Sequence, residues 1–111
     1  MPNILAFDTT SRFTNIALSA NGKIYQVSSD KENNHSEEII ILINSLLQQA
    51  SISFQDLDEV ITCRGPGSFT GTRIGLAVAK GLKLTTRAKI FAISNFQAIA
   101  CSLLQQKITS P

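Results

Sequence analysis

A glycine-rich loop holds the residues of this sequence that are best suited to chemistry. Residues 65–68, Gly-Pro-Gly-Ser, lie between a strand-like apolar run and a helical pattern. Such a junction presents free backbone N–H groups at the positive end of a helix dipole, where an anion can bind. The loop is not a P-loop, because residues 71–73 are Gly-Thr-Arg, and Thr70 replaces the third glycine of the dinucleotide-binding pattern. It either binds an anion or turns the chain sharply, with Ser68 or Thr70 capping the helix.

A second polar segment, Asp8-Thr9-Thr10-Ser11, follows the first apolar run. It resembles the first phosphate loop of sugar and acetate kinase-like ATPases, where an aspartate positions magnesium and hydroxyls hold phosphate. Thr10 replaces the usual glycine of that loop, and nucleotide binding there also needs a second lobe. We therefore expect no nucleotide on this chain alone, and ATP or ADP only in a complex. The structural alternative for Asp8 is a strand-end carboxylate that accepts turn N–H groups.

The hydrophobic pattern predicts the elements that hold these two loops. Apolar and β-branched runs predict five strands, over residues 3–8, 14–20, 23–29, 59–63 and 89–93. Asn21-Gly22 predicts a type I′ hairpin between the second and third strands. Helical periodicity predicts three helices: one capped by Asn34 and ending at Ala50, one from Ser68 or Thr70 to Leu82, and one capped by Ser94 or Asn95 and ending at Gln106.

The order of these elements, βββαβαβα, predicts the fold class. Right-handed crossovers place the fourth and fifth strands parallel to the first. We expect an α/β domain with a mixed five-stranded sheet in the order 3-2-1-4-5 and helices on both faces. This is the ribonuclease H-like lobe of the actin-like ATPase superfamily. The length of 111 residues fits one such domain, residues 1–111.

The first two predicted helices have unusual compositions. The first is apolar around most of its girth from Ile39 to Leu47, so it has to be covered on more than one side. In the second, Gly71, Gly75 and Ala79 recur at every fourth position. An interior glycine costs about 0.5–1 kcal/mol relative to alanine, so this stripe serves close packing. It packs either against the first helix or against a helix of another protein.

Three segments together resemble one protein family. Residues 4–11 are Ile-Leu-Ala-Phe-Asp-Thr-Thr-Ser, and residues 35–37 are His-Ser-Glu. The signature run begins Arg64, Gly65, Pro66, Gly67, Ser68, Phe69, Thr70, Gly71, Thr72, Arg73 and continues to Leu82. This pattern resembles the amino-terminal lobe of the TsaB family, also called YeaZ.

The resemblance implies a role in making threonylcarbamoyladenosine at the adenosine beside the anticodon of tRNA. It implies a non-catalytic scaffold that activates a TsaD-like partner, with a TsaE-like ATPase as a further subunit and no catalytic residue of its own. The interface would lie on the helices, at His35, Ile39, Ile43, Gly71, Ile74, Gly75 and Val78. The family's second lobe is missing from residues 1–111, so a remnant that folds and dimerises without activating anything is the alternative.

His35 bears on a further alternative, a metallopeptidase of the glycoprotease type (peptidase M22). Two histidines four residues apart on a helix can bind a metal, as in the catalytic paralogue. His35 is the single histidine here, Ile39 stands at the second position, and Glu37 and Glu38 are poor substitutes. We therefore expect no metal. His35 itself is either a capping or surface residue or an interface contact.

Composition limits the partners. A net charge of +2 is low for a dedicated nucleic-acid binder, so we expect no strong direct binding of tRNA. The first residues lack a signal peptide pattern, and the longest apolar run, residues 39–43, is too short for a membrane span. We expect a cytoplasmic protein. Apolar surface left by a missing lobe favours a homodimer in isolation.

Overall fold

The computed structural model describes residues 2–8, 14–29, 35–63 and 69–93. Its strands are β1 (Ile4–Asp8), β2 (Thr14–Ala20), β3 (Lys23–Ser29), β4 (Glu59–Cys63) and β5 (Lys89–Ile93). Its helices are α1 (His35–Ala50) and α2 (Phe69–Thr85), with a 3₁₀ turn, η1, at Phe54–Asp56. The helix predicted to end at Gln106 lies outside the described residues.

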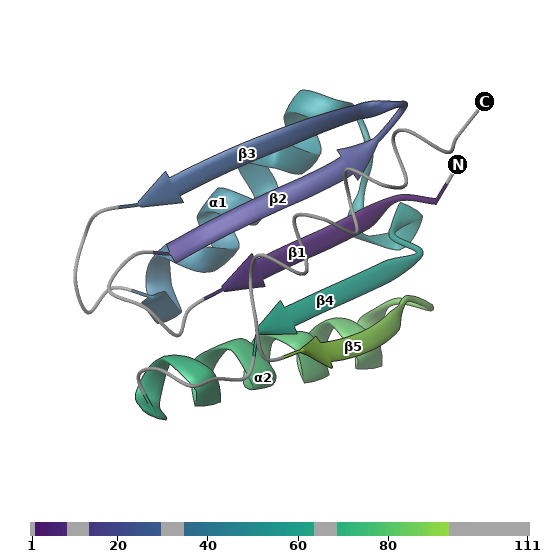
Figure 1. Cartoon of the computed structure of the whole chain (residues 1–111). Helices are drawn as coiled ribbons and strands as arrows, with labels where there is room; N and C mark the ends of the chain where they lie inside the picture. Colours follow the sequence, from purple (N-terminus) through teal and green to yellow (C-terminus); the bar gives the residue numbers. More distant parts are fainter. Residues whose placement is uncertain (1, 9–13, 30–34, 64–68, 94–111) are drawn as a thin grey trace.

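The strands form one mixed sheet in the order β3-β2-β1-β4-β5. β1 pairs antiparallel with β2, and β2 with β3, whereas β4 is parallel to both β1 and β5. The predicted topology is therefore confirmed. Both described helices cover the same face of the sheet, with α1 over β2 and β3 and α2 over β4 and β5 (Figure 1).

The hairpin between β2 and β3 turns as its sequence predicts. Asn21 and Gly22 both have positive φ, at 56° and 74°, as a type I′ turn requires. The Asn21 side chain also donates a hydrogen bond from Nδ2 to the Ala50 carbonyl at 2.9 Å. The turn thus satisfies a carbonyl at the carboxyl end of α1, which would otherwise have no helical partner.

Local hydrogen bonds set where both helices end. Ser51 adopts a left-handed φ of 57°, and the Ser51 and Ile52 amides donate to the Gln48 and Leu47 carbonyls at 3.1 and 3.0 Å. This is the Schellman pattern, and it ends α1. α2 continues to Thr85, beyond the predicted Leu82. There the Thr86 hydroxyl donates to the Leu82 carbonyl at 2.7 Å.

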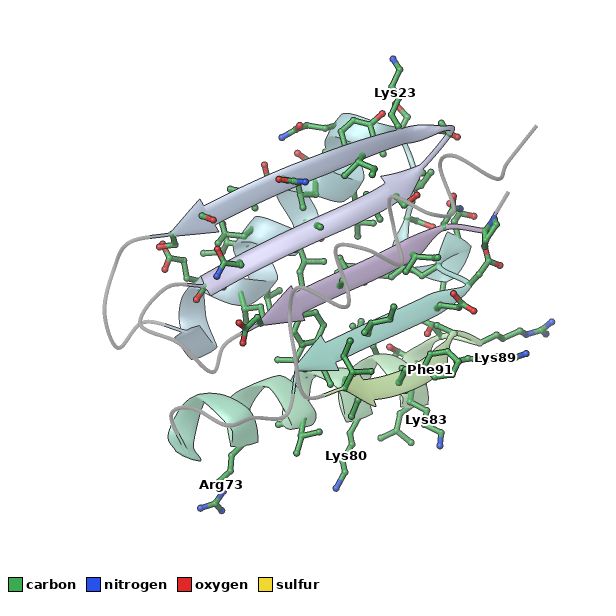
Figure 2. All side chains as sticks on the ribbon, viewed as in Figure 1. Lys23, Arg73, Lys80, Lys83, Lys89 and Phe91 are labelled. Atoms are coloured by element: carbon green, nitrogen blue, oxygen red, sulfur yellow. The ribbon has the colours of Figure 1, made fainter. Side chains whose placement is uncertain are left out.

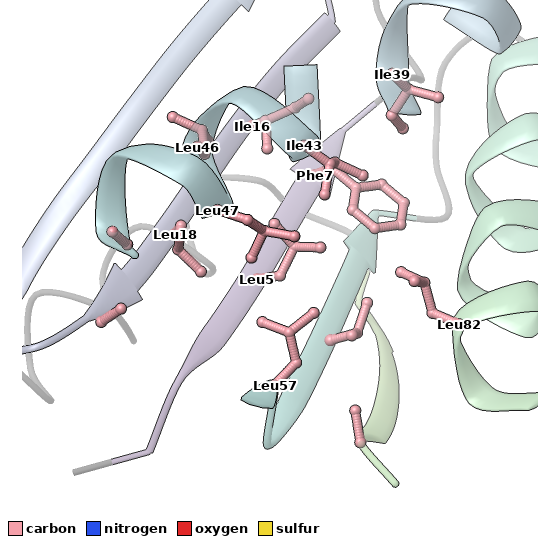
Figure 3. Close-up of a cluster of buried hydrophobic side chains, with 14 of the residues drawn as sticks. Leu5, Phe7, Ile16, Leu18, Ile39, Ile43, Leu46, Leu47, Leu57 and Leu82 are labelled. Carbon is pink, nitrogen blue, oxygen red and sulfur yellow. The ribbon is translucent and has the colours of Figure 1, made fainter. Parts of the chain in front are cut away.

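The main core lies between the sheet and the two helices. Phe7 of β1 is fully buried near both α1 and α2, with Leu5 on the same strand (Figure 3). Val60 of β4, in register with Leu5, belongs to the same core. α1 contributes one continuous inward stripe: Ile39, Ile43, Leu46, Leu47 and Ala50. Each fully buried Ile or Leu side chain contributes about 1.5–3 kcal/mol, so this stripe holds α1 on the sheet.

A smaller apolar cluster lies on the opposite face. Ile4, Ala6 and Ala17 are buried there, and Ile24, Ile61 and Ile93 are partly buried against them. Helices were predicted on both faces, and the third predicted helix, which ends at Gln106, lies outside the described part of the chain. Neither described helix combines the length and apolar character needed to cross a membrane.

Candidate functional site

The carboxyl ends of the three parallel strands meet at one edge of the sheet, where ligands bind in many open α/β folds. Asp8 ends β1 there, with only 7% of its surface exposed and with an interaction inside the chain. That setting supports a strand-end carboxylate held by its own surroundings. Thr9, Thr10 and residues 64–68 belong to the same edge in sequence, but they lie outside the described residues.

Thr62 is one residue before the end of β4 and is fully buried in register with Phe7. Its Oγ1 has no hydrogen-bond partner in the described part of the chain, and neither does the buried Glu38 Oε2. An unpaired buried polar oxygen costs about 1–3 kcal/mol, so each of these two atoms lowers the stability of the fold. Across the described ranges, no three His, Cys, Asp or Glu side chains gather in a way that would hold a metal.

The signature run starts α2. The helix begins at Phe69 and includes Thr70 and Gly71, so the predicted start between Ser68 and Thr70 is confirmed. Arg73 is exposed on the first turns and interacts within the chain. The remaining positions, Arg64 to Ser68, and the side chains of Phe69 to Thr72 fall outside what the structure describes.

The structure corrects the predicted partner surface on α1. Ile39 and Ile43 are both 0% exposed and belong to the core under the helix, so they have no surface to offer a partner. The exposed isoleucines are their neighbours, Ile40 at 42% and Ile41 at 67%. The side chain of His35 lies outside the part of the chain that the structure describes.

The small-residue stripe of α2 also faces inward. Gly75 is buried, and Ala79, at 1% exposed, belongs to the main core with Val78 packed against it. Gly75 and Ala79 therefore pack inside the domain, where α2 lies mainly on β4 and β5 and only to a smaller extent against α1, the predicted neighbour. Gly71 and Ile74 cannot be assigned to either side, because the structure describes no side-chain environment for them.

The exposed side of α1 is the clearest candidate surface for a protein partner. From Ile39 onward, where every side chain of α1 is described, the exposed residues besides Ile40 and Ile41 are uncharged and polar: Asn44, Ser45, Gln48 and Gln49. These neighbours bring no ion that would have to be desolvated when a partner covers the apolar pair. The sequence contained a signal for this side. Asn44 and Gln48 follow Ile40 at intervals of four residues, so the three lie on one side of the helix, and two of them are polar.

Comparisons with known proteins agree with this geometry. Residues 24–111 match a family model described as TsaD, tRNA N6-adenosine threonylcarbamoyltransferase. The chain is 35% identical over 97 residues to the tRNA threonylcarbamoyladenosine biosynthesis protein TsaB of Buchnera aphidicola subsp. Schizaphis graminum, covering 87% of this chain and 46% of that protein. It is 31% identical over 97 residues to the TsaB of Escherichia coli strain K12, covering 87% of this chain and 42% of that one.

A solved structure shows the same fold. YeaZ from Pseudomonas aeruginosa superposes with a TM-score of 0.82 at 28% identity, over 86% of this chain and 45% of that one. The chain thus spans less than half the length of these relatives. It belongs to the TsaD family and, within that family, corresponds to an amino-terminal part of the TsaB (YeaZ) proteins.

Proposed function

We propose that this chain acts in threonylcarbamoyladenosine modification of tRNA as a non-catalytic subunit that docks on a TsaD-type protein through the exposed side of α1. The names of its TsaB relatives supply the pathway. The main support for this docking site is that Ile40 and Ile41 are exposed, on a helix whose other apolar residues are buried or, for Leu42, partly buried in the core.

The energetics favour a protein partner on this surface. Fully burying an isoleucine contributes about 1.5–3 kcal/mol, and Ile40 and Ile41 retain 42% and 67% of their surface for such burial. Two adjacent apolar anchors beside uncharged polar residues form the kind of centre around which helix-to-helix contacts assemble. A TsaE-like ATPase joining the same complex, and ATP or ADP bound there, are parts of the same proposal.

Ile41→Asp tests the docking site. An aspartate at this exposed position places an unpaired charge at the contact while leaving the core untouched. We expect its affinity for the cognate TsaD-type protein, measured by calorimetry, to fall at least roughly tenfold, since an uncompensated buried charge costs several kcal/mol. Gln55→Asp, exposed on η1 and outside α1, is the matched control and should bind normally.

Reconstitution tests the role itself. The chain would be added to the TsaD-type protein, the TsaE-type ATPase, the enzyme that forms the carbamoyl-adenylate, and tRNA, and modified adenosine would be measured. Modification that depends on the chain and falls with Ile41→Asp supports the proposal. Modification at background with every variant supports the alternative, a unit that folds without activating the pathway.

A homodimer through the same surface is the second candidate. One helix face that meets its own copy about a twofold axis is the commonest form of symmetric contact. Sedimentation of the wild type and of Ile41→Asp separates this arrangement from docking on TsaD. A wild-type dimer that Ile41→Asp converts to a monomer would assign the surface to self-association.

A further inference from the structure

The chain's modest net charge conceals two regions of opposite sign. Residues 1–59 contain three basic and eight acidic side chains, a formal charge of −5, whereas residues 60–111 contain seven basic and no acidic ones, a formal charge of +7. Such asymmetry between two parts of a chain is a sequence signal for binding a polyanion. The net charge of +2 is the sum of these two values and does not show the asymmetry.

The structure gathers five of these cations at one border of the molecule. All are exposed, and they form what we call the basic surface: Arg73, Lys80, Lys83, Arg87 and Lys89. Arg73, Lys80 and Lys83 extend from α2 and Lys89 from β5, at the border of the sheet away from Lys23 on β3 (Figure 2). Arg87 lies in the connection between α2 and β5. No acidic residue occurs in α2, in β5 or between them.

We propose that the basic surface binds the phosphate backbone of an RNA, and in the setting of the proposed function, on which this inference rests, the RNA is the tRNA that is modified. Arg73 and Lys83 are ten residues apart on α2, which separates them by about 15 Å along the helix axis. A single phosphate group cannot engage cations over that distance, but an extended backbone can. Phosphate contacts from Lys and Arg supply most of the sequence-independent affinity for nucleic acids.

Two apolar side chains accompany the cations. Leu84, 87% exposed, follows Lys83 on α2, and Phe91, 44% exposed, stands on the edge strand β5 (Figure 2). RNA-binding surfaces combine cations with aromatic rings on which unpaired bases stack. Because Ile90 packs into the main core under α2, Phe91 points to the other face of the sheet, as Lys89 does. It offers an unpaired base a platform on that face, across the β5 edge from Lys80 and Lys83.

Acidic groups lie at one end of the basic surface. Lys89 is paired in register with Glu59, and a hollow of 630 Å³ at the start of these strands is lined by Asp58 and Glu59 as well as Arg87 and Lys89. Opposite charges directly across two strands attract each other, so Lys89 is partly neutralised. Because Arg73 also interacts within the chain, Lys80, Lys83 and Arg87 remain as the cations most available to phosphates.

The test compares a triple variant, Lys80→Gln with Lys83→Gln and Arg87→Gln, with Lys23→Gln, the control at the opposite border. Fluorescence anisotropy with labelled tRNA would be measured over a range of KCl concentrations, for the chain alone and for its complex with the TsaD-type protein. Each lost phosphate contact reduces the slope of log affinity against log salt by about 1. We expect the triple variant to bind tRNA roughly tenfold or more weakly, with a slope lower by about 2–3.

Lys23→Gln should match the wild type in both measurements. An unchanged tRNA affinity of the triple variant overturns the inference. If the triple variant instead loses the TsaD-type protein while tRNA binding is unchanged, the surface binds an acidic protein and the inference also fails. The proposed function has a separate test: it fails if the wild-type chain does not bind the TsaD-type protein. Even then, the tRNA affinity of the chain alone shows whether the basic surface binds RNA.

Discussion

The two helices of this domain cover the same face of one sheet, yet their exposed sides differ in chemistry. α1 presents Ile40 and Ile41 among uncharged polar residues, whereas α2 presents Lys80 and Lys83 beside Leu84. Their inward sides are alike, because both supply small or aliphatic residues to the main core. The inward residues hold the fold together, and the difference between the outward residues is the basis for proposing a protein contact on α1 and a polyanion on α2.

The largest expected effect separates the two sides of α1. Ile43→Asp places a charge among fully buried residues, and we expect it to destabilise the domain by roughly 3–5 kcal/mol or to unfold it. Ile41→Asp, on the exposed side, should change stability by less than about 0.5 kcal/mol. Urea unfolding followed by circular dichroism measures both. An Ile43→Asp protein that folds normally would contradict the inward assignment of this residue.

A smaller effect separates the two sides of α2. Gly75 is buried, so Gly75→Leu overpacks the core and should cost about 1–3 kcal/mol or more, whatever partner is present. Thermal unfolding of the chain alone is the readout. If the variant kept its stability and lost only its partner, the small-residue stripe would belong to an interface instead of the core.

The next effect, of about 1 kcal/mol, concerns the turn that holds α1 in place. Asn21→Ala removes the hydrogen bond to the Ala50 carbonyl and puts a less tolerant residue at a φ of 56°. We expect a lower midpoint in urea, with the fold retained. Gly22→Asn is the comparison, since asparagine accepts positive φ, and it should lose less stability. Equal losses in the two variants would argue against the role of the Asn21 side chain.

The smallest effect should be a gain. Gly81 is exposed on α2, and a Cβ added to it would meet nothing within 4 Å. Gly81→Ala should therefore stabilise the domain by about 0.5–1 kcal/mol, because alanine favours the helix and restricts the unfolded chain. A loss of stability in chemical denaturation would show that this side of α2 is more crowded than the structure indicates.

Local signals explain what the sequence predicted well. Asn21-Gly22 determined the hairpin, and short β-branched runs separated by helical periods determined the strand order. The end of α2 was predicted three residues early, because the pattern does not show that a threonine hydroxyl will satisfy the carbonyl of Leu82.

The predicted partner surface failed for a different reason. Apolar residues occupy every position from Ile39 to Ile43, so composition could not tell which of them face the sheet. Packing decided it, and the stripe that includes Ile39 and Ile43 faces inward. The net charge of +2 likewise does not show where the charges lie, so the expectation of weak tRNA binding stays a prediction, which the proposed basic surface opposes. Both cases needed the spatial arrangement of residues whose types were already known.

The most direct test of the account measures two variants against two ligands. Ile41→Asp and the triple glutamine variant of Lys80, Lys83 and Arg87 would each be titrated with the TsaD-type protein and with labelled tRNA. We predict that Ile41→Asp loses affinity only for the TsaD-type protein and that the triple variant loses affinity only for the tRNA. If one variant lost both ligands, or if neither lost any, the assignment of separate roles to the two helices would be contradicted.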